Sequence, residues 1–109
     1  MNTSILTVDK TYKIERTNYG GNTGNYGMII LKGAAVSVTV TGSQSRPTYL
    51  TDLVDLIEGL SWNTGAISAA GAYAFWMLPE YIRIAGTVDA IEIVGYKAIE
   101  DLGELPASA

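Results

Sequence analysis

The sequence predicts a mainly β protein, an antiparallel β-sandwich or jelly roll formed as a single domain over residues 1–109. β-Branched residues are the first observation, because 11 Ile, 7 Val and 11 Thr supply more than a quarter of the 109 residues, and such side chains fit a pleated sheet. Short stretches with strand patterning follow one another at a spacing of roughly ten residues, which is typical of a sandwich. Apolar residues make up 48% and charged residues 17% of the chain, a composition that excludes intrinsic disorder.

The first elements are strands followed by a long loop. Tyr12 and Ile14 alternate with charged side chains, and this period of two indicates a half-buried strand. Residues 3–16 therefore predict two short strands or one bent strand. Residues 17–27 contain four Gly and three Asn, which favour turns. We expect an exposed loop there, either a hairpin tip or an adaptable contact loop that presents two tyrosines.

Two strands are predicted in the middle of the chain. Residues 28–31 form a continuous apolar run bounded by Gly27 and Gly33, which predicts a buried strand. Residues 36–41 alternate Val with Ser or Thr and predict the clearest strand of the chain, with the valines inward. Residues 42–47 predict a turn.

One short helix is expected near residues 48–59. Apolar side chains in this stretch follow a spacing of three and four, as on one face of a helix, and Gly59 suits its C-terminal end. The apolar positions are Leu50, Leu53, Val54, Ile57 and Leu60. The carboxylates Asp52, Asp55 and Glu58 fall on the opposite face.

The last strands are predicted after residue 71. Residues 72–77 are apolar on both faces, so this strand is either buried twice or rests one face against a partner, and Pro79 ends it. Residues 81–84 and 91–93 alternate Ile with polar or aromatic residues and predict two further strands. A turn is expected between them at residues 86–87.

The residue types exclude much chemistry. The chain has no Cys and no His, which removes disulfides, thiol nucleophiles and the commonest general base. The net charge of -4 argues against non-specific nucleic-acid binding, which needs basic charge. No apolar run approaches the length of about 20 residues that a membrane span needs, and the start lacks the pattern of a secretory signal. We therefore expect no enzyme, cofactor, metal, nucleic acid or membrane.

Two groups of carboxylates are candidate sites. Asp52, Asp55 and Glu58 could hold a cation from one helix face, but a solvated face is the simpler interpretation. Glu80 and Glu92, on strands expected to be adjacent, could form a glycosidase pair. Surface charge is the simpler interpretation here too.

Aromatic side chains are the candidates for contact with a partner. The partner-interface candidates are Tyr19, Tyr26, Trp62, Trp76 and Tyr81. Tyrosine and tryptophan supply large contact areas at interfaces. A second interpretation gathers Tyr73, Trp76, Tyr81 and Tyr96, with Trp62, into a platform for sugar rings, and a third makes them core aromatics.

Charge is divided unevenly along the chain. Residues 1–46 carry a net charge of +3 and residues 47–109 a net charge of -7. Chance explains such a division, and so does a basic surface that meets an acidic surface of a neighbouring copy. The acidic tail, residues 100–109, is expected to be held in place by a contact, from a neighbour or otherwise.

The order of motifs after residue 35 resembles a known group of proteins. The motifs are VSVTVTGS at 36–43, GAYAF at 71–75, PEYIRI at 79–84 and GTVDAIEI at 86–93. This order is similar to the small jelly-roll or discoidin-like sandwiches of bacteriophage virions, over a little more than half the chain. The resemblance implies a capsid decoration, head-fibre or tail-associated role, usually as an oligomer. It also implies a strand at residues 49–54, where the spacing predicts a helix.

These inferences lead to an expected function. We expect a non-enzymatic structural protein of a bacteriophage particle, a capsid decoration or cement protein that acts through protein–protein contacts. Its partners are expected to be other copies of itself and a major capsid protein, with a surface glycan as a further candidate. Its expected place is the virion, after synthesis in the host cytoplasm. The alternative is a carbohydrate-binding module or a tail or head-fibre adhesion domain.

Overall fold

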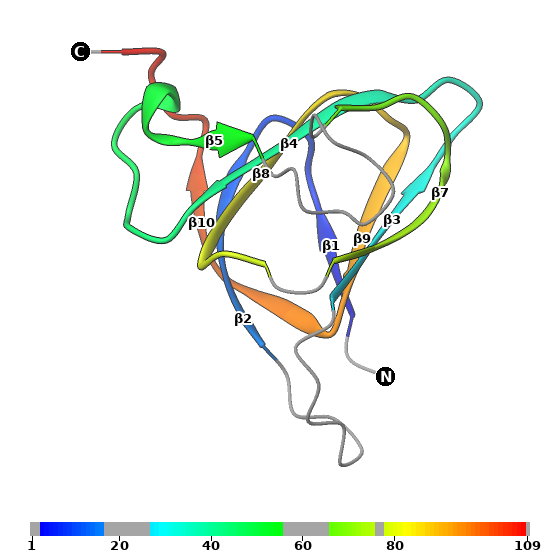
Figure 1. The fold of residues 1–109 in the computed structure, drawn as a ribbon, viewed down its shortest axis with the longest axis horizontal. Helices are drawn as coiled ribbons and strands as arrows, with labels where there is room; N and C mark the ends of the chain where they lie inside the picture. Colours follow the sequence, from blue (N-terminus) through cyan, green and yellow to red (C-terminus); the bar gives the residue numbers. More distant parts are fainter. Residues whose placement is uncertain (1–2, 17–26, 56–65, 76–77, 109) are drawn as a thin grey trace.

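The computed structural model describes residues 3–16, 27–55, 66–75 and 78–108 (Figure 1). The strands in these ranges are β1 (Thr3–Leu6), β2 (Thr11–Arg16), β3 (Gly27–Lys32), β4 (Ser37–Ser43), β5 (Val54–Asp55), β6 (Ala66–Ile67), β7 (Gly71–Phe75), β8 (Tyr81–Thr87), β9 (Ala90–Val94) and β10 (Tyr96–Gly103). One 3₁₀ turn, η1, spans Leu50–Asp52. Within the same ranges, no helix has the length and apolar character needed to cross a membrane.

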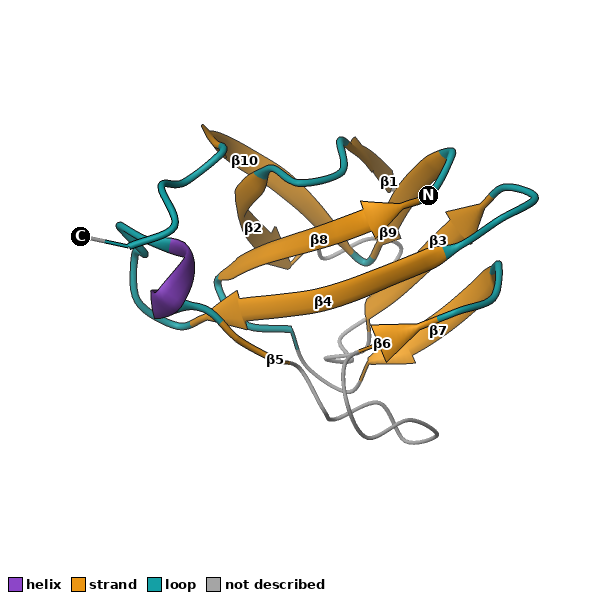
Figure 2. Ribbon diagram, turned by 90° about the horizontal axis from the view of Figure 1, so that it is seen from above, coloured by secondary structure: helices purple, strands orange, loops and turns teal. Residues whose placement is uncertain are grey.

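The strands form two sheets that pack face to face (Figure 2). The four-stranded sheet has the order β1-β9-β3-β7, and the six-stranded sheet has the order β10-β2-β8-β4-β5, with β6 also paired to β4. Each of these pairings is antiparallel. The predicted mainly β fold, an antiparallel β-sandwich, is therefore confirmed.

The core lies between the two sheets and follows the period of two. Alternate residues of each central strand point inward, because successive side chains of a strand project from opposite faces. The buried apolar residues are Leu6, Tyr12, Ile14, Ile29, Leu31, Val36, Val38, Val40, Ile67, Leu78, Ile82, Ile84, Ile91, Ile93 and Tyr96. Isoleucine and valine dominate this set, and their stiff side chains pack well on a pleated surface.

The predicted turn at residues 86–87 is wrong, because both residues lie inside β8. Gly86 is opposite Val38 in the pairing of β8 with β4. Its φ angle is 129°, and a Cβ atom there would collide with the backbone oxygen of Ser37. Glycine is thus needed here for a close approach between strands, and the chain reverses afterwards, at Val88 and Asp89.

The predicted helix near residues 48–59 is also wrong over the part that the structure describes. Only η1 is helical, and Val54 and Asp55 pair with β4 as a short strand. The apolar residues of the expected helix face have no core beneath them, since Leu50 and Leu53 are half-buried and Val54 is 64% exposed. A short helix without such packing is not stable. Residues 56–65 lie outside the described ranges.

The acidic tail is held by its own chain. Residues 96–103 form β10, which pairs along the whole of β2. Beyond β10, the Leu50 backbone N–H donates a hydrogen bond to the Pro106 carbonyl at 2.8 Å. The expectation that a contact orders this segment is met within one subunit.

Candidate functional site

The outward side of the four-stranded sheet is apolar. We call the residues there the apolar face: Ile5, Met28, Ile30, Ala72, Ala90 and Val94. They alternate with the buried residues of β1, β3, β7 and β9, and the register places Ile5, Glu92, Ile30 and Ala72 in one row across the four strands. Ile5 is 69% exposed and Met28 is 37% exposed.

This face departs from the usual pattern of a two-layer sandwich. The solvent side of an antiparallel sheet is normally polar. Here the described charged side chains are Lys32 and Glu92, which form an ion pair with each other on neighbouring strands. An apolar sheet face whose charges are neutralised is weakly hydrated. Exposed apolar patches of this kind mark contact sites.

The outward side of the six-stranded sheet is different, because it is polar and partly covered. Lys13 lies 5.9 Å from the centre of the Tyr81 ring and 3.6 Å from the Glu80 carboxylate. Arg46, from the segment that follows β4, forms two hydrogen bonds with Glu100 of β10, at 3.0 and 2.7 Å. These hydrogen bonds, with the attraction of the opposite charge, hold the pKa of Glu100 below its usual value and raise the pKa of Arg46.

The turn before β5 is built around one carboxylate. Asp52 accepts hydrogen bonds from the backbone N–H groups of Thr48 and Tyr49, at 2.9 and 3.0 Å. These two donors, with Tyr49 the stronger, lower the pKa of Asp52. Asp52 therefore has a structural role, and the described residues contain no group of three carboxylates that could hold a metal ion.

Of the five predicted interface aromatics, Tyr81 lies among the described residues. Tyr19, Tyr26, Trp62 and Trp76 lie outside the described residues. Tyr81 lies in β8 and is 5% exposed. Its role at an interface stays a prediction.

The other aromatics of the sugar-platform hypothesis are built into the subunit. Tyr96 is 5% exposed, and its hydroxyl accepts a hydrogen bond from the Leu78 backbone N–H at 3.2 Å. Tyr73 packs against the core and donates a hydrogen bond from its hydroxyl to the Ala69 carbonyl at 2.6 Å. These rings do not form an exposed row on the described surface.

The proposed glycosidase pair is not brought together. Glu80 precedes β8 of the six-stranded sheet, whereas Glu92 lies in β9 of the four-stranded sheet. Each pairs with a lysine of its own sheet, Lys13 and Lys32 respectively. The expectation that the two carboxylates lie on adjacent strands is wrong.

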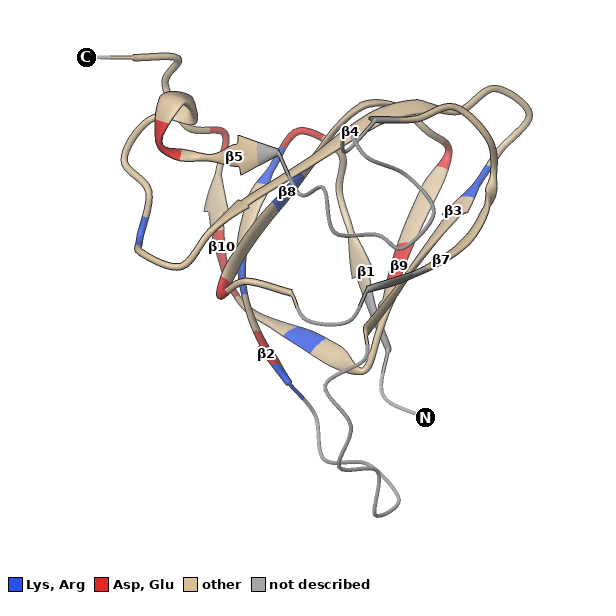
Figure 3. Ribbon diagram, viewed as in Figure 1, with Lys and Arg blue, Asp and Glu red and all other residues tan. Residues whose placement is uncertain are grey.

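The basic and acidic parts of the chain meet within one subunit (Figure 3). Because β2 and β10 are neighbours, Lys10 contacts Asp101 at 3.6 Å and Lys97 contacts Glu15 at 3.9 Å. The charge division along the sequence thus reflects strand pairing inside the fold.

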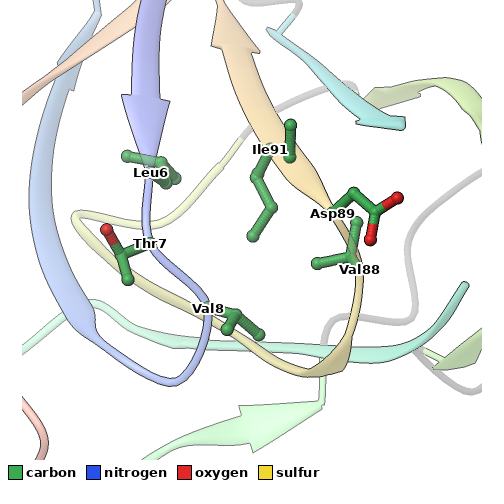
Figure 4. A pocket seen from close by; sticks show the side chains of 7 residues that line it. Leu6, Thr7, Val8, Val88, Asp89 and Ile91 are labelled. Carbon is green, nitrogen blue, oxygen red and sulfur yellow. The ribbon is translucent and has the colours of Figure 1, made fainter. Parts of the chain in front are cut away.

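Two hollows open at the ends of the sandwich. The first has a volume of about 190 Å³ and lies between the end of β1 and the chain entering β9. Val8, Val88 and Ile91 point toward one another there (Figure 4). It is smaller than typical small-molecule pockets, which measure about 300–1,000 Å³.

The second hollow lies beside the end of β2, the chain entering β8 and the start of β10, and has a volume of about 360 Å³. Its apolar floor is formed by Ile14, Leu78, Pro79 and Tyr96. Its polar side chains are Arg16, Gln44 and Glu80. These residues come from four separate stretches of the chain, so the sequence alone did not bring them together.

Sequence reasoning found one part of the apolar face, the strand predicted at residues 72–77, and missed the rest. The apolar run at residues 28–31 predicts a buried strand, yet Met28 is 37% exposed. The signal that could have revealed the face is the apolar character of both alternating sets in several strands of one sheet. Comparisons with known proteins find no matching family model, no matching curated protein and no matching solved structure.

Proposed function

We propose that this chain is a non-enzymatic structural protein that works by binding other protein subunits. The apolar face is the observation that carries the proposal. It presents Ile5, Met28, Ile30 and Val94 on a rigid sheet, with the Lys32–Glu92 pair among them. Covering a side chain such as that of Ile5 contributes about 1.5–3 kcal/mol, so a few of these residues are enough for a specific contact.

The resemblance to virion sandwiches supports a particular setting for this activity. In that setting the chain decorates or cements a bacteriophage capsid, with other copies of itself and a major capsid protein as partners. A decoration protein needs a rigid fold, no cofactor and a surface that loses water on attachment. The apolar face supplies the last of these.

The test uses one variant in the apolar face and one matched control outside it. Ile5→Ser removes an exposed apolar side chain from the face, and Val54→Ser removes one of similar exposure, 64% against 69%, from β5. Sedimentation velocity measures self-association, and co-sedimentation with phage capsid shells assembled without the protein measures attachment. We expect Ile5→Ser to weaken association at least about tenfold, and Val54→Ser to leave it unchanged.

Two results would contradict the proposal. A wild-type chain that stays monomeric and ignores capsid shells at every accessible concentration would remove the proposal. Equal weakening by both variants would show that the apolar face has no special part in binding.

A further inference from the structure

The geometry points to a second binding site, in which the hollow around Arg16 takes a sugar that carries a carboxylate. This hollow is the one of about 360 Å³ described above. It lies at the end of the core, and the apolar face lies on the outside of the other sheet. The two proposals are therefore independent of each other.

Arg16 is placed in the hollow by the period of β2. Tyr12 and Ile14 point into the core, so the next residue in the same series is Arg16, which is opposite the buried Tyr96 of β10. Its side chain continues the inward row just where the core ends, and it lines the hollow. A cation in this position lies at the edge of the core, on the inward side of the sheet, and its side chain is exposed to solvent.

Arg16 also differs from the other cations of the protein. The chain has seven Lys and Arg residues. Six of them form an ion pair with a carboxylate in the described structure, in the pairs Lys10–Asp101, Lys13–Glu80, Lys32–Glu92, Arg46–Glu100, Arg83–Asp9 and Lys97–Glu15. Arg16 has no such partner among the described residues. Its guanidinium can therefore donate two parallel hydrogen bonds to an external carboxylate.

The rest of the lining fits a sugar ring better than a simple carboxylate. Gln44 and Glu80 place a planar amide and a planar carboxylate on the rim, and both can bond to hydroxyl groups. Lys13 pairs with Glu80 at 3.6 Å and offsets its negative charge. Pro79 and Tyr96 supply an apolar surface for the C–H side of a ring. The volume falls at the lower end of the usual range for small-ligand sites.

The experiment is a titration of the ¹⁵N-labelled full chain with D-glucuronate, D-glucose and acetate, followed by NMR. D-Glucuronate should shift the backbone signal of Leu78 and the side-chain amide of Gln44, with a dissociation constant on the order of 1 mM, as expected for a one-ring ligand in an open site. Glucose, which lacks the carboxylate, and acetate, which lacks the ring, should each bind at least about tenfold more weakly.

Variants separate the site from a general charge effect. Arg16→Gln should weaken glucuronate binding at least about tenfold and leave the melting temperature unchanged, since Arg16 forms no ion pair with a described residue. Lys10→Gln, in the turn between β1 and β2, removes a cation that does not line the hollow, so it is the matched control and should bind as wild type does. Binding by Arg16→Gln within twofold of wild type would overturn the proposal. So would equal affinity for glucose or acetate, or the absence of any shift with glucuronate.

Discussion

Asp9 has a positive φ angle of 70°, and no other described residue except glycine does. Aspartate tolerates this left-handed conformation better than most residues. The local contacts explain why it is held there. Its carboxylate accepts a hydrogen bond from the Gly86 backbone N–H at 3.2 Å, and its own backbone N–H donates to the Ile84 carbonyl at 2.8 Å. Asp9 thus fastens the turn between β1 and β2 onto β8.

Replacing Asp9 separates the two parts of this role. Asp9→Ala removes the hydrogen-bond acceptor. It also leaves a residue in the left-handed region whose side chain forms no hydrogen bond to stabilise that conformation. We therefore expect the unfolding free energy to fall by about 2 kcal/mol. Asp9→Asn keeps an acceptor oxygen, and asparagine also tolerates the left-handed conformation. We expect its unfolding free energy to lie within about 0.5 kcal/mol of the wild-type value. Urea unfolding of both variants measures the difference. A similar loss in both would show that the charge near Arg83, at 3.8 Å, matters more than the turn.

At the scale of the strands, the contact between β8 and β4 depends on Gly86. A Cβ atom there would lie 3.0 Å from the Val38 Cα atom and closer still to the Ser37 oxygen, both of them backbone. We expect Gly86→Ala to cost about 3 kcal/mol or more, because neither strand can move away without breaking the ladder. Gly103→Ala is the control, since φ is 72° but nothing lies within 4 Å, and we expect it to cost about 1 kcal/mol. Equal losses in thermal or urea unfolding would refute the close-approach argument.

The link between the segment after β4 and strand β10 predicts a pH dependence. The hydrogen bonds from Arg46 lower the pKa of Glu100 in the folded state below its ordinary value of 4.5. The contribution of this pair is therefore complete above about pH 4.5 and is lost as the pH falls through the lowered folded-state pKa. Melting temperatures of wild type and Glu100→Gln should differ by a constant amount between about pH 7 and 5.

Below that range the two melting temperatures should converge, because Glu100 becomes protonated in the wild type as well. Arg46→Gln is a second variant that should reproduce the same profile, since it removes the other half of the pair. A difference that stays constant down to about pH 3 would show that Glu100 acts through packing and not through its charge.

At the scale of the whole molecule, six of the described basic side chains form ion pairs within the subunit. The proposed assembly through the apolar face then needs no charge pairing between copies. We expect the association rate constant to change by less than about threefold between about 0.1 M and 1 M salt, although the screening length falls to about 3 Å. Stopped-flow measurements at the two ionic strengths test this. A strong fall in rate would indicate that charges on neighbouring copies do meet.

The sequence predicts the strands better than it predicts the segments that connect them. Alternation is a local property, so β2 and β4 could be predicted from their own residues. The spacing of apolar residues after Tyr49 is helical, but helix stability depends on a core to pack against, and that core is absent there. Local pattern was overridden by the pairing of Val54 with Gly42.

The candidate sites depend on register, which the sequence does not contain. Arg16 becomes part of a hollow only because β2 pairs with β10 and because Gln44 and Leu78 arrive from elsewhere. The apolar face requires that β1, β9 and β3 lie side by side. Neither arrangement could be derived before the order of strands was known.

The strand order has a consequence for how the chain folds during synthesis. β1 pairs with β9, and β2 pairs with β8 and β10, so β1 and β2 leave the ribosome before these partner strands do. The two sheets therefore cannot be completed before β8, β9 and β10 have been synthesised, and pairings so distant along the sequence are typical of slow β-rich folders, on the scale of milliseconds to seconds. During that wait β1 and β2 have unpaired edges exposed, which is a hazard for aggregation. The yield of folded protein should thus respond more strongly to chaperones than its final stability would suggest.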